Sequence, residues 1–137
     1  MANALYAAGR NSFLKGEIDW ESDDIRCMLV DTNDYAVDLD NDAVFSDVDA
    51  GAIVKKMTAS MSNKTATAGV ADADDVTLAS VSGDPSEAII IYKHDSGTEA
   101  NGLLIAYLDT GTGLPVTPNG GDISILWDNG SNKIFRL

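Results

Sequence analysis

The chain has 137 residues, of which 45% are hydrophobic and 23% are charged. This length suits one domain with a real hydrophobic core, and the apolar content argues against disorder throughout. The 22 acidic residues outnumber the nine Lys and Arg residues, so the formal net charge is −13. Because phosphate backbones and anionic lipids are bound by Lys and Arg, this charge argues against nucleic acid or a membrane as a partner. The length therefore predicts a single domain over residues 1–137.

Targeting signals and disulfides are not expected either. Residues 1–6 lack the basic start and apolar stretch of a signal peptide, and no apolar run approaches the roughly 20 residues that span a bilayer. The one cysteine, Cys27, has no partner for an internal disulfide. It lies in an apolar run, which favours a buried structural thiol over a catalytic one. We expect a protein that is made and kept in the cytosol unless a particle carries it out.

The N-terminal segment predicts a short helix over residues 3–15. Ala7 and Ala8 favour helix, and Gly16 is a natural stop. The segment 1–16 either packs on its own domain or serves as a docking arm for a neighbouring molecule.

Strand patterns begin after residue 18. The apolar run 25–30 predicts a strand that the polar stretch 31–34 ends, and residues 35–45 are predicted to be mostly loop. Residues 53–61 predict a further strand. Residues 76–81 alternate apolar and polar side chains, which is typical of a half-buried strand.

The clearest strands are the continuous apolar runs 88–92 and 103–108. Both are short, rich in β-branched or aromatic residues, and bounded by turn formers, so we expect central strands covered on both faces. The polar stretch 94–102 fits a hairpin loop between them. Alternation over 123–127, the turn sequence 128–132 and the run 133–137 predict a last strand that pairs back.

Short strands separated by frequent turn signals are typical of all-β folds. The chain is therefore predicted to be mainly β, an antiparallel β-sandwich or barrel of about six to eight short strands with a short N-terminal helix.

No residue pattern for catalysis stands out. The single histidine, His94, is predicted to be an exposed turn residue rather than a general base. A Ser–His–Asp arrangement stays open, because such triads assemble in three dimensions, but the chain has no Gly-x-Ser-x-Gly elbow. Cys/His metal clusters, Walker A loops and dinucleotide fingerprints are also missing from the sequence. We expect no cofactor.

One acidic stretch is a weak calcium candidate. Asp38, Asp40 and Asp42 alternate as at the start of an EF-hand loop. The match then fails, since Ala43 stands where the turning glycine belongs and Asp49 replaces the bidentate glutamate. A solvated acidic loop is the favoured interpretation.

Apolar side chains near the N-terminus are candidates for contact with another subunit, because aromatic residues are enriched at interfaces. Burial in the chain's own core is the alternative interpretation. The candidates are Leu5, Tyr6, Phe13, Leu14 and Trp20.

Nine stretches spread over nearly the whole chain suggest a family. They are ANALYA (2–7), FL (13–14), IDW (18–20), LVDT (29–32), AGAIV (50–54), GVADADDV (69–76), LIAY (104–107), GLPVTPNGGD (113–122) and WD (127–128). With these stretches the chain resembles a family of small virion structural proteins of tailed bacteriophages.

The resemblance implies a capsid decoration, or cement, protein without catalytic residues, carried in the virion. Its partner would be the major capsid protein, and a homo-oligomer, with a trimer favoured, would hold neighbouring shell subunits together. Two alternatives remain open. One is a head–tail connector or tail component, and the other is a calcium- or carbohydrate-binding module on the particle surface. An enzyme has the least support.

Overall fold

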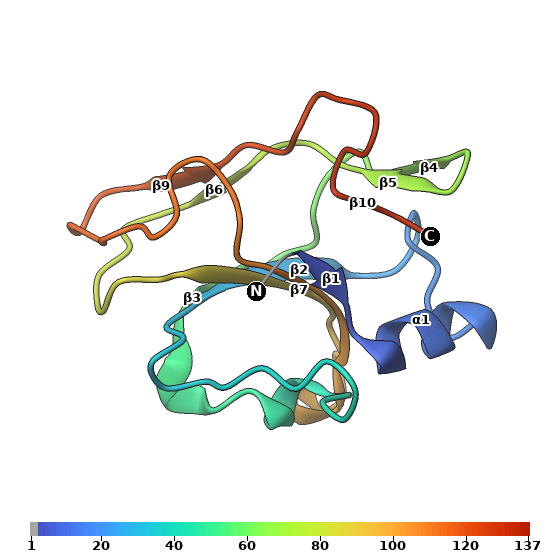
Figure 1. Cartoon of the computed structure of the whole chain (residues 1–137), viewed down its shortest axis with the longest axis horizontal. Helices are drawn as coiled ribbons and strands as arrows, with labels where there is room; N and C mark the ends of the chain where they lie inside the picture. Colours follow the sequence, from blue (N-terminus) through green and yellow to red (C-terminus); the bar gives the residue numbers. More distant parts are fainter. Residues whose placement is uncertain (1–2) are drawn as a thin grey trace.

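The computed structural model describes residues 3–137, which form ten strands in three antiparallel sheets and one short α-helix (Figure 1). The five-stranded sheet runs in the order β1 (Ala4–Leu5), β8 (Leu103–Leu108), β7 (Ala88–Lys93), β2 (Ile25–Val30) and β3 (Ile53–Lys56). The three-stranded sheet is β10 (Phe135–Arg136), β5 (Val70–Asp72) and β4 (Thr65–Thr67), and the two-stranded sheet is β6 (Val76–Leu78) and β9 (Ile123–Ile125). The predicted fold class, mainly β and antiparallel with a short N-terminal helix, is confirmed, although the strands number ten and not six to eight.

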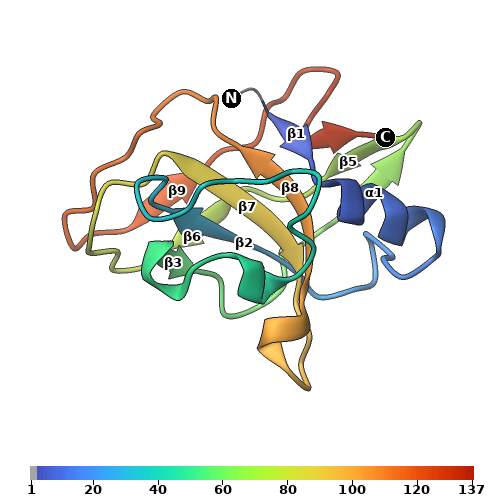
Figure 2. The same cartoon turned by 60° about the horizontal axis from the view of Figure 1, so that its bottom comes forward.

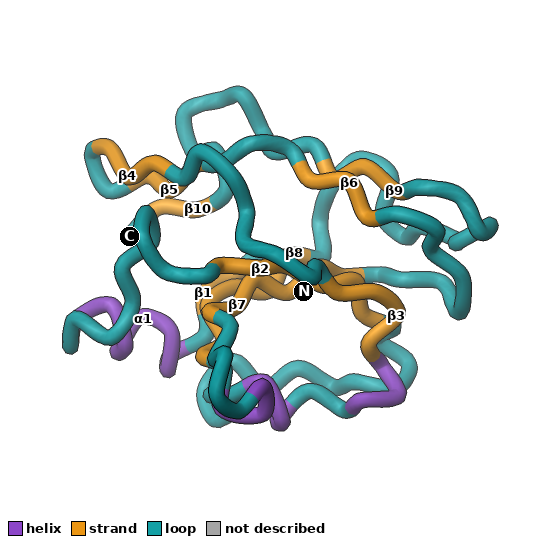
Figure 3. Tube along the Cα trace, turned by 180° about the vertical axis from the view of Figure 1, so that it is seen from behind, coloured by secondary structure: helices purple, strands orange, loops and turns teal. Residues whose placement is uncertain are grey.

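The five-stranded sheet is the middle layer of the molecule. The two smaller sheets lie side by side over one of its faces (Figures 1 and 3). The loop 31–52, with short 3₁₀ turns at Phe45–Asp47 and Ala50–Ala52, covers the other face (Figure 2). A third 3₁₀ turn, Glu99–Asn101, lies in the hairpin loop between β7 and β8.

Burial on both faces explains the continuous apolar runs of the central strands. Side chains alternate across a strand. In β2, Cys27 and Leu29 therefore enter the core under the smaller sheets, while Met28 and Val30 enter a second core under the loop 31–52. β7 and β8 divide their side chains between the same two cores. The prediction that these strands are covered on both faces is confirmed.

The N-terminal segment packs on its own domain. β1 pairs with β8 through Ala4 and Leu5, and the backbone N–H of Tyr6 donates to the carbonyl of Ile105 at 2.9 Å. The helix predicted over 3–15 therefore begins only after this strand. It is α1 (Ala7–Leu14), which lies against β8 with a close approach at Gly9. Of the two interpretations of segment 1–16, the described residues 3–16 follow the first. Residues 1 and 2 lie outside the described part.

Two strand predictions need correction. The strand expected over 53–61 ends at Lys56, because the chain then bends until the N–H of Met61 donates to the carbonyl of Ile25. The last strand, β10, pairs with β5 and not with the strand before it. The carboxylate of Asp75 accepts the N–H of Trp127 at 2.8 Å, which ends the β6–β9 ladder and lets the chain cross to the other small sheet.

No helix in residues 3–137 has the length and hydropathy needed to cross a bilayer.

Candidate interaction groove

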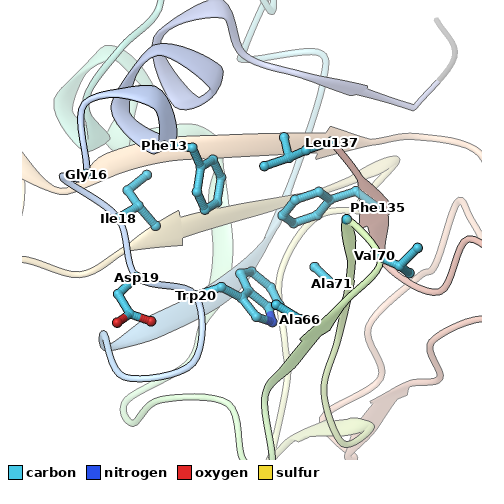
Figure 4. A pocket seen from close by; sticks show the side chains of 11 residues that line it. Phe13, Gly16, Ile18, Asp19, Trp20, Ala66, Val70, Ala71, Phe135 and Leu137 are labelled. Atoms are coloured by element: carbon cyan, nitrogen blue, oxygen red, sulfur yellow. The ribbon is translucent and has the colours of Figure 1, made fainter.

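A groove of about 440 Å³ lies between the N-terminal segment and the β10-β5-β4 sheet (Figure 4). Phe13, Ile18 and Trp20 come from the N-terminal side, and Val70 and Phe135 face them from β5 and β10. Its lining is mostly apolar, and several lining residues, such as Leu137 and Ala66, are exposed to solvent. We call this feature the interaction groove.

Three aromatic rings form the floor of the interaction groove. The rings of Trp20 and Phe135 meet edge to face, with centroids 5.1 Å apart and planes at 85°, and Phe13 lies 6.1 Å from Phe135. The indole Nε1 of Trp20 donates to the carbonyl of Asp72 at 3.1 Å. Edge-to-face contact and a satisfied indole are typical of a firmly placed aromatic cluster. The floor is thus a preformed apolar surface.

A glycine turn brings the N-terminal wall to the sheet. Phe13 stands in the last turn of α1, and Gly16, with a φ of +74°, accepts the left-handed conformation that ends the helix. Left-handed backbone is tolerated best by glycine. The chain then reverses so that Ile18 and Trp20 reach the sheet from the same side as Phe13.

The rim of the groove is acidic. Glu17, Asp19 and Glu21 are all exposed, and Asp19 lines the groove itself. Hydrogen bonds from the side chain and backbone of Ser22, with a further one from the backbone of Glu21, hold the pKa of Asp19 below its ordinary value. Asp19 therefore stays ionised at neutral pH. An apolar floor with an anionic rim favours a partner that carries both apolar and basic side chains.

The structure separates the five predicted interface residues. Phe13 and Trp20 meet in the interaction groove, although Trp20 is only 5% exposed. Leu14 is 87% exposed on another side of α1, beside Asp40. Leu5 is half-buried against the main core. Tyr6 is 0% exposed and lies in the second core, which agrees with the alternative interpretation, burial in the chain's own core.

Sequence reasoning missed the opposite wall. Val70, Phe135 and Leu137 belong to it, and their place depends on β10 pairing with β5. The run 133–137 was expected beside 123–127, which would have put Phe135 elsewhere. The one sequence signal for this wall is the stretch 69–76, which carries part of the family resemblance and contains Val70.

The predicted calcium ligands organise a loop instead of converging. Asp38 accepts hydrogen bonds from the side chain and backbone of Asn41, which hold its pKa below the ordinary value. Asp42 accepts the hydroxyl of Tyr35 at 2.6 Å and the N–H of Asp38 at 2.9 Å. Asp40 is exposed. These bonds direct the carboxylates at the backbone and at Tyr35, so the structure gives no support to the calcium prediction.

A different acidic trio comes together. Within residues 3–137, the only group of three or more potential ligand side chains with all ligand atoms inside 4.8 Å is Asp31, Asp34 and Asp84. Asp31 is buried and accepts the N–H of Asn33 at 2.8 Å, so its carboxylate already has a partner.

The environments of Cys27 and His94 can also be compared with the sequence predictions. Cys27 is fully buried, as predicted, and burial raises the pKa of its thiol to about 12. His94 is half-buried at the end of β7, where its backbone N–H donates to the carbonyl of Asp24 at 2.8 Å. The expectation of an exposed turn histidine is therefore wrong, because the loop before β2 packs against it.

Comparison with models of known protein families and with curated proteins finds no match for this chain. Its function has to be inferred from its own residues. In physical terms, the interaction groove offers apolar contact area, negative charge and the neighbouring edge of β4.

Proposed function

We propose that the protein is a non-enzymatic structural component of a tailed-bacteriophage virion, specifically a capsid decoration protein that stabilises the head shell. The observation that carries this proposal is the interaction groove, which offers a preformed apolar surface on an otherwise acidic body. The groove is concave and mostly apolar, and Leu137, which is 60% exposed, leaves apolar area at its rim free for contact with a partner. A cement protein works in this way, by surface buried between neighbours.

The stretches that carry the sequence resemblance include two that line the interaction groove. Two of the stretches that carry it, 18–20 and 69–76, lie on facing walls of the interaction groove, where Trp20 stands opposite Ala71. The body behind the groove is a sheet buried on both faces, which suits a part that must hold its shape under load. The remaining acidic surface would face solvent and keep the protein soluble.

We propose the major capsid protein as the partner and the virion as the location, after synthesis in the bacterial cytoplasm. Shell proteins repeat around symmetry axes, so a decoration protein meets several equivalent neighbours at once. A homo-oligomer, with a trimer as the first candidate, would match a three-fold position of such a shell.

The deciding experiment is quantitative mass spectrometry on purified particles that have been separated into heads and tails. A copy number in heads comparable with that of the shell subunits supports decoration. A few copies per particle, or a location in tails, would replace decoration with the connector or tail-component function. Absence from both fractions would overturn the virion proposal.

A further inference from the structure

The outer edge of β4 is the first feature to consider. β4 is the last strand in the order β10-β5-β4, and all of its residues, Thr65–Thr67, are exposed. In an antiparallel ladder, alternate residues direct their N–H and C=O groups away from the neighbouring strand. Ala66 is the residue of β4 that does so, because its N–H donates to a side chain outside the sheet. An open edge of this kind is a template for another strand.

A carboxylate occupies the place of a partner strand. The Oε1 atom of Glu21 accepts the N–H of Ala66 at 2.9 Å. The position is that of a carbonyl oxygen in an added strand, so Glu21 satisfies the edge donor while the edge is free. Glu21 itself is exposed, and only its side chain has to rotate to release the edge.

The edge adjoins the interaction groove. Ala66 belongs to both, since it lines the groove across from Trp20 (Figure 4). An extended segment that pairs with Ala66 can therefore place an apolar side chain over the aromatic floor. Main-chain bonds along an edge and side chains in a neighbouring pocket are together the mode of recognition by strand addition.

Charge decides what kind of segment fits. Asp19 lines the groove, Glu21 accepts the N–H of Ala66, and Glu17 directly precedes a lining residue, Ile18, while the whole chain carries a net charge of −13. A segment with Lys or Arg beside its apolar residues gains from these carboxylates, including Glu21 once it has left Ala66. A second copy of β4 would instead bring its own three carboxylates against them, and like charges oppose that pairing.

We propose that an extended, basic segment of another protein, with apolar side chains at alternate positions, adds as a strand beside β4 and displaces Glu21. Its apolar side chains enter the interaction groove. The proposed function enters here only through the source of the segment, which would be an arm of a neighbouring virion subunit. The site itself concerns the isolated protein and is testable without particles.

The first test uses the purified full chain and a fluorescein-labelled synthetic peptide of alternating Lys and Val. We expect saturable binding by fluorescence anisotropy, a change in Trp20 fluorescence, and chemical-shift changes at the amides of Thr65–Thr67. Raised salt should weaken the binding, because exposed charges are screened. The matched peptide of alternating Glu and Val should not bind. Equal binding of both peptides, or no binding of the Lys–Val peptide, would overturn the proposal.

The second test removes the edge donor. Ala66→Pro deletes the outward N–H and leaves the β4–β5 ladder bonds in place, which is the position in which an edge strand accepts proline. We expect the affinity for the Lys–Val peptide to fall about tenfold or more. Ala66→Ser keeps the N–H and is the matched control. Circular dichroism and thermal unfolding show whether the proline variant is folded.

A third pair of variants tests the groove without touching the backbone edge. Leu137 is 60% exposed beside the groove, and Leu126 is 73% exposed outside it. Leu137→Ser should weaken peptide binding several-fold, whereas Leu126→Ser should leave it unchanged. Equal effects of the two substitutions, or full affinity in a folded Ala66→Pro variant, would refute strand addition. Membership in particles is decided separately by mass spectrometry, so either proposal can fail without the other.

Discussion

At the scale of single residues, a buried hydrogen-bond chain joins the N-terminal segment to the acidic loop. The hydroxyls of Tyr6 and Tyr35 are 2.9 Å apart, and Tyr35 donates to Asp42 at 2.6 Å. Burial raises the pKa of both tyrosines above the ordinary 10.0, and the hydrogen bond to Asp42 raises that of Tyr35 further. Asp42 is thereby held in place as the acceptor for the N–H of Asp38.

Tyr35→Phe tests this chain. The substitution leaves Tyr6 and Asp42 without their shared partner, so we expect the free energy of unfolding to fall by about 1–3 kcal/mol. The control is Tyr92→Phe. Tyr92 is equally buried, but within residues 3–137 its hydroxyl has no hydrogen-bond partner, so its removal should be neutral or stabilising. Urea unfolding at neutral pH measures both. A loss in Tyr35→Phe no larger than in Tyr92→Phe would contradict the stabilising role.

The same tyrosines set an alkaline limit on stability. Their pKa is higher in the folded state than in the unfolded state, so the unfolded chain releases protons first as the pH rises. Their contribution to stability is therefore complete below a pH of about 10 and is lost progressively above it. We expect the free energy of unfolding to fall as the pH is raised above about 10, and to fall less steeply in the Tyr35→Phe variant. An identical slope in the variant would count against this assignment.

At the scale of elements, Gly9 sets the distance between α1 and β8. A Cβ atom at this position would lie 2.8 Å from the carbonyl oxygen of Leu104 and 2.9 Å from the Cα of Ile105. Helix propensity alone favours alanine over glycine by roughly 0.5–1 kcal/mol. The contacts at Gly9 are with backbone atoms, which cannot rotate away. The steric clash therefore outweighs helix propensity, and the net effect of alanine on stability is unfavourable.

Gly9→Ala is accordingly expected to destabilise the protein by about 1–3 kcal/mol, despite the better helix former. Gly111→Ala is the matched control, because its Cβ would meet only the flexible side-chain end of Leu114 at 3.8 Å. Thermal unfolding of the two variants beside the unchanged protein gives the comparison. A rise in stability for Gly9→Ala would mean that α1 does not pack as closely as described.

The sequence predicts an element well when the pattern of the element's own residues shows that it is buried. β2 matches its predicted bounds, 25–30, and β8 matches 103–108, because an unbroken apolar run needs cover on both faces whatever the cover is. The β4–β5 hairpin was missed. Its turn is Ala68-Gly69, both with positive φ, instead of the expected Asn-Gly type, and β4 has no apolar pattern.

The residues of the interaction groove also fall into two groups, those that local sequence patterns predict and those that they do not. Phe13 and Trp20 were predicted as interface residues from their composition and place in the sequence. Phe135 reaches them because β10 pairs with β5, after a hydrogen bond to Asp75, 52 positions earlier in the chain, has fixed Trp127 beyond the end of β9. Strand partners set by such long-range bonds are not visible in a local pattern.

At the scale of the whole molecule, the two faces of the middle sheet are covered by different kinds of structure. One face has two further sheets above it, and the other has the loop 31–52 with its two 3₁₀ turns (Figure 2). The loop is attached by a few backbone hydrogen bonds, such as those from Phe45 to Gly102 and from Leu104 to Ala43. Its cover therefore depends on fewer ladder bonds than that of the opposite face.

Because the two faces of the middle sheet are covered differently, we expect one cover to open more easily than the other. Segments with few ladder bonds open in partial unfolding steps that require less free energy than global unfolding. Amide protons of the loop 31–52 should exchange with deuterium well before those of β2, β7 and β8, as peptide-level hydrogen–deuterium exchange can measure. Equal protection of loop and strands would show that the molecule opens only as a whole. With the loop open, Met28, Ile90 and Tyr92 would be bared on an intact sheet, and this partly open form is where we expect self-association of the protein to begin.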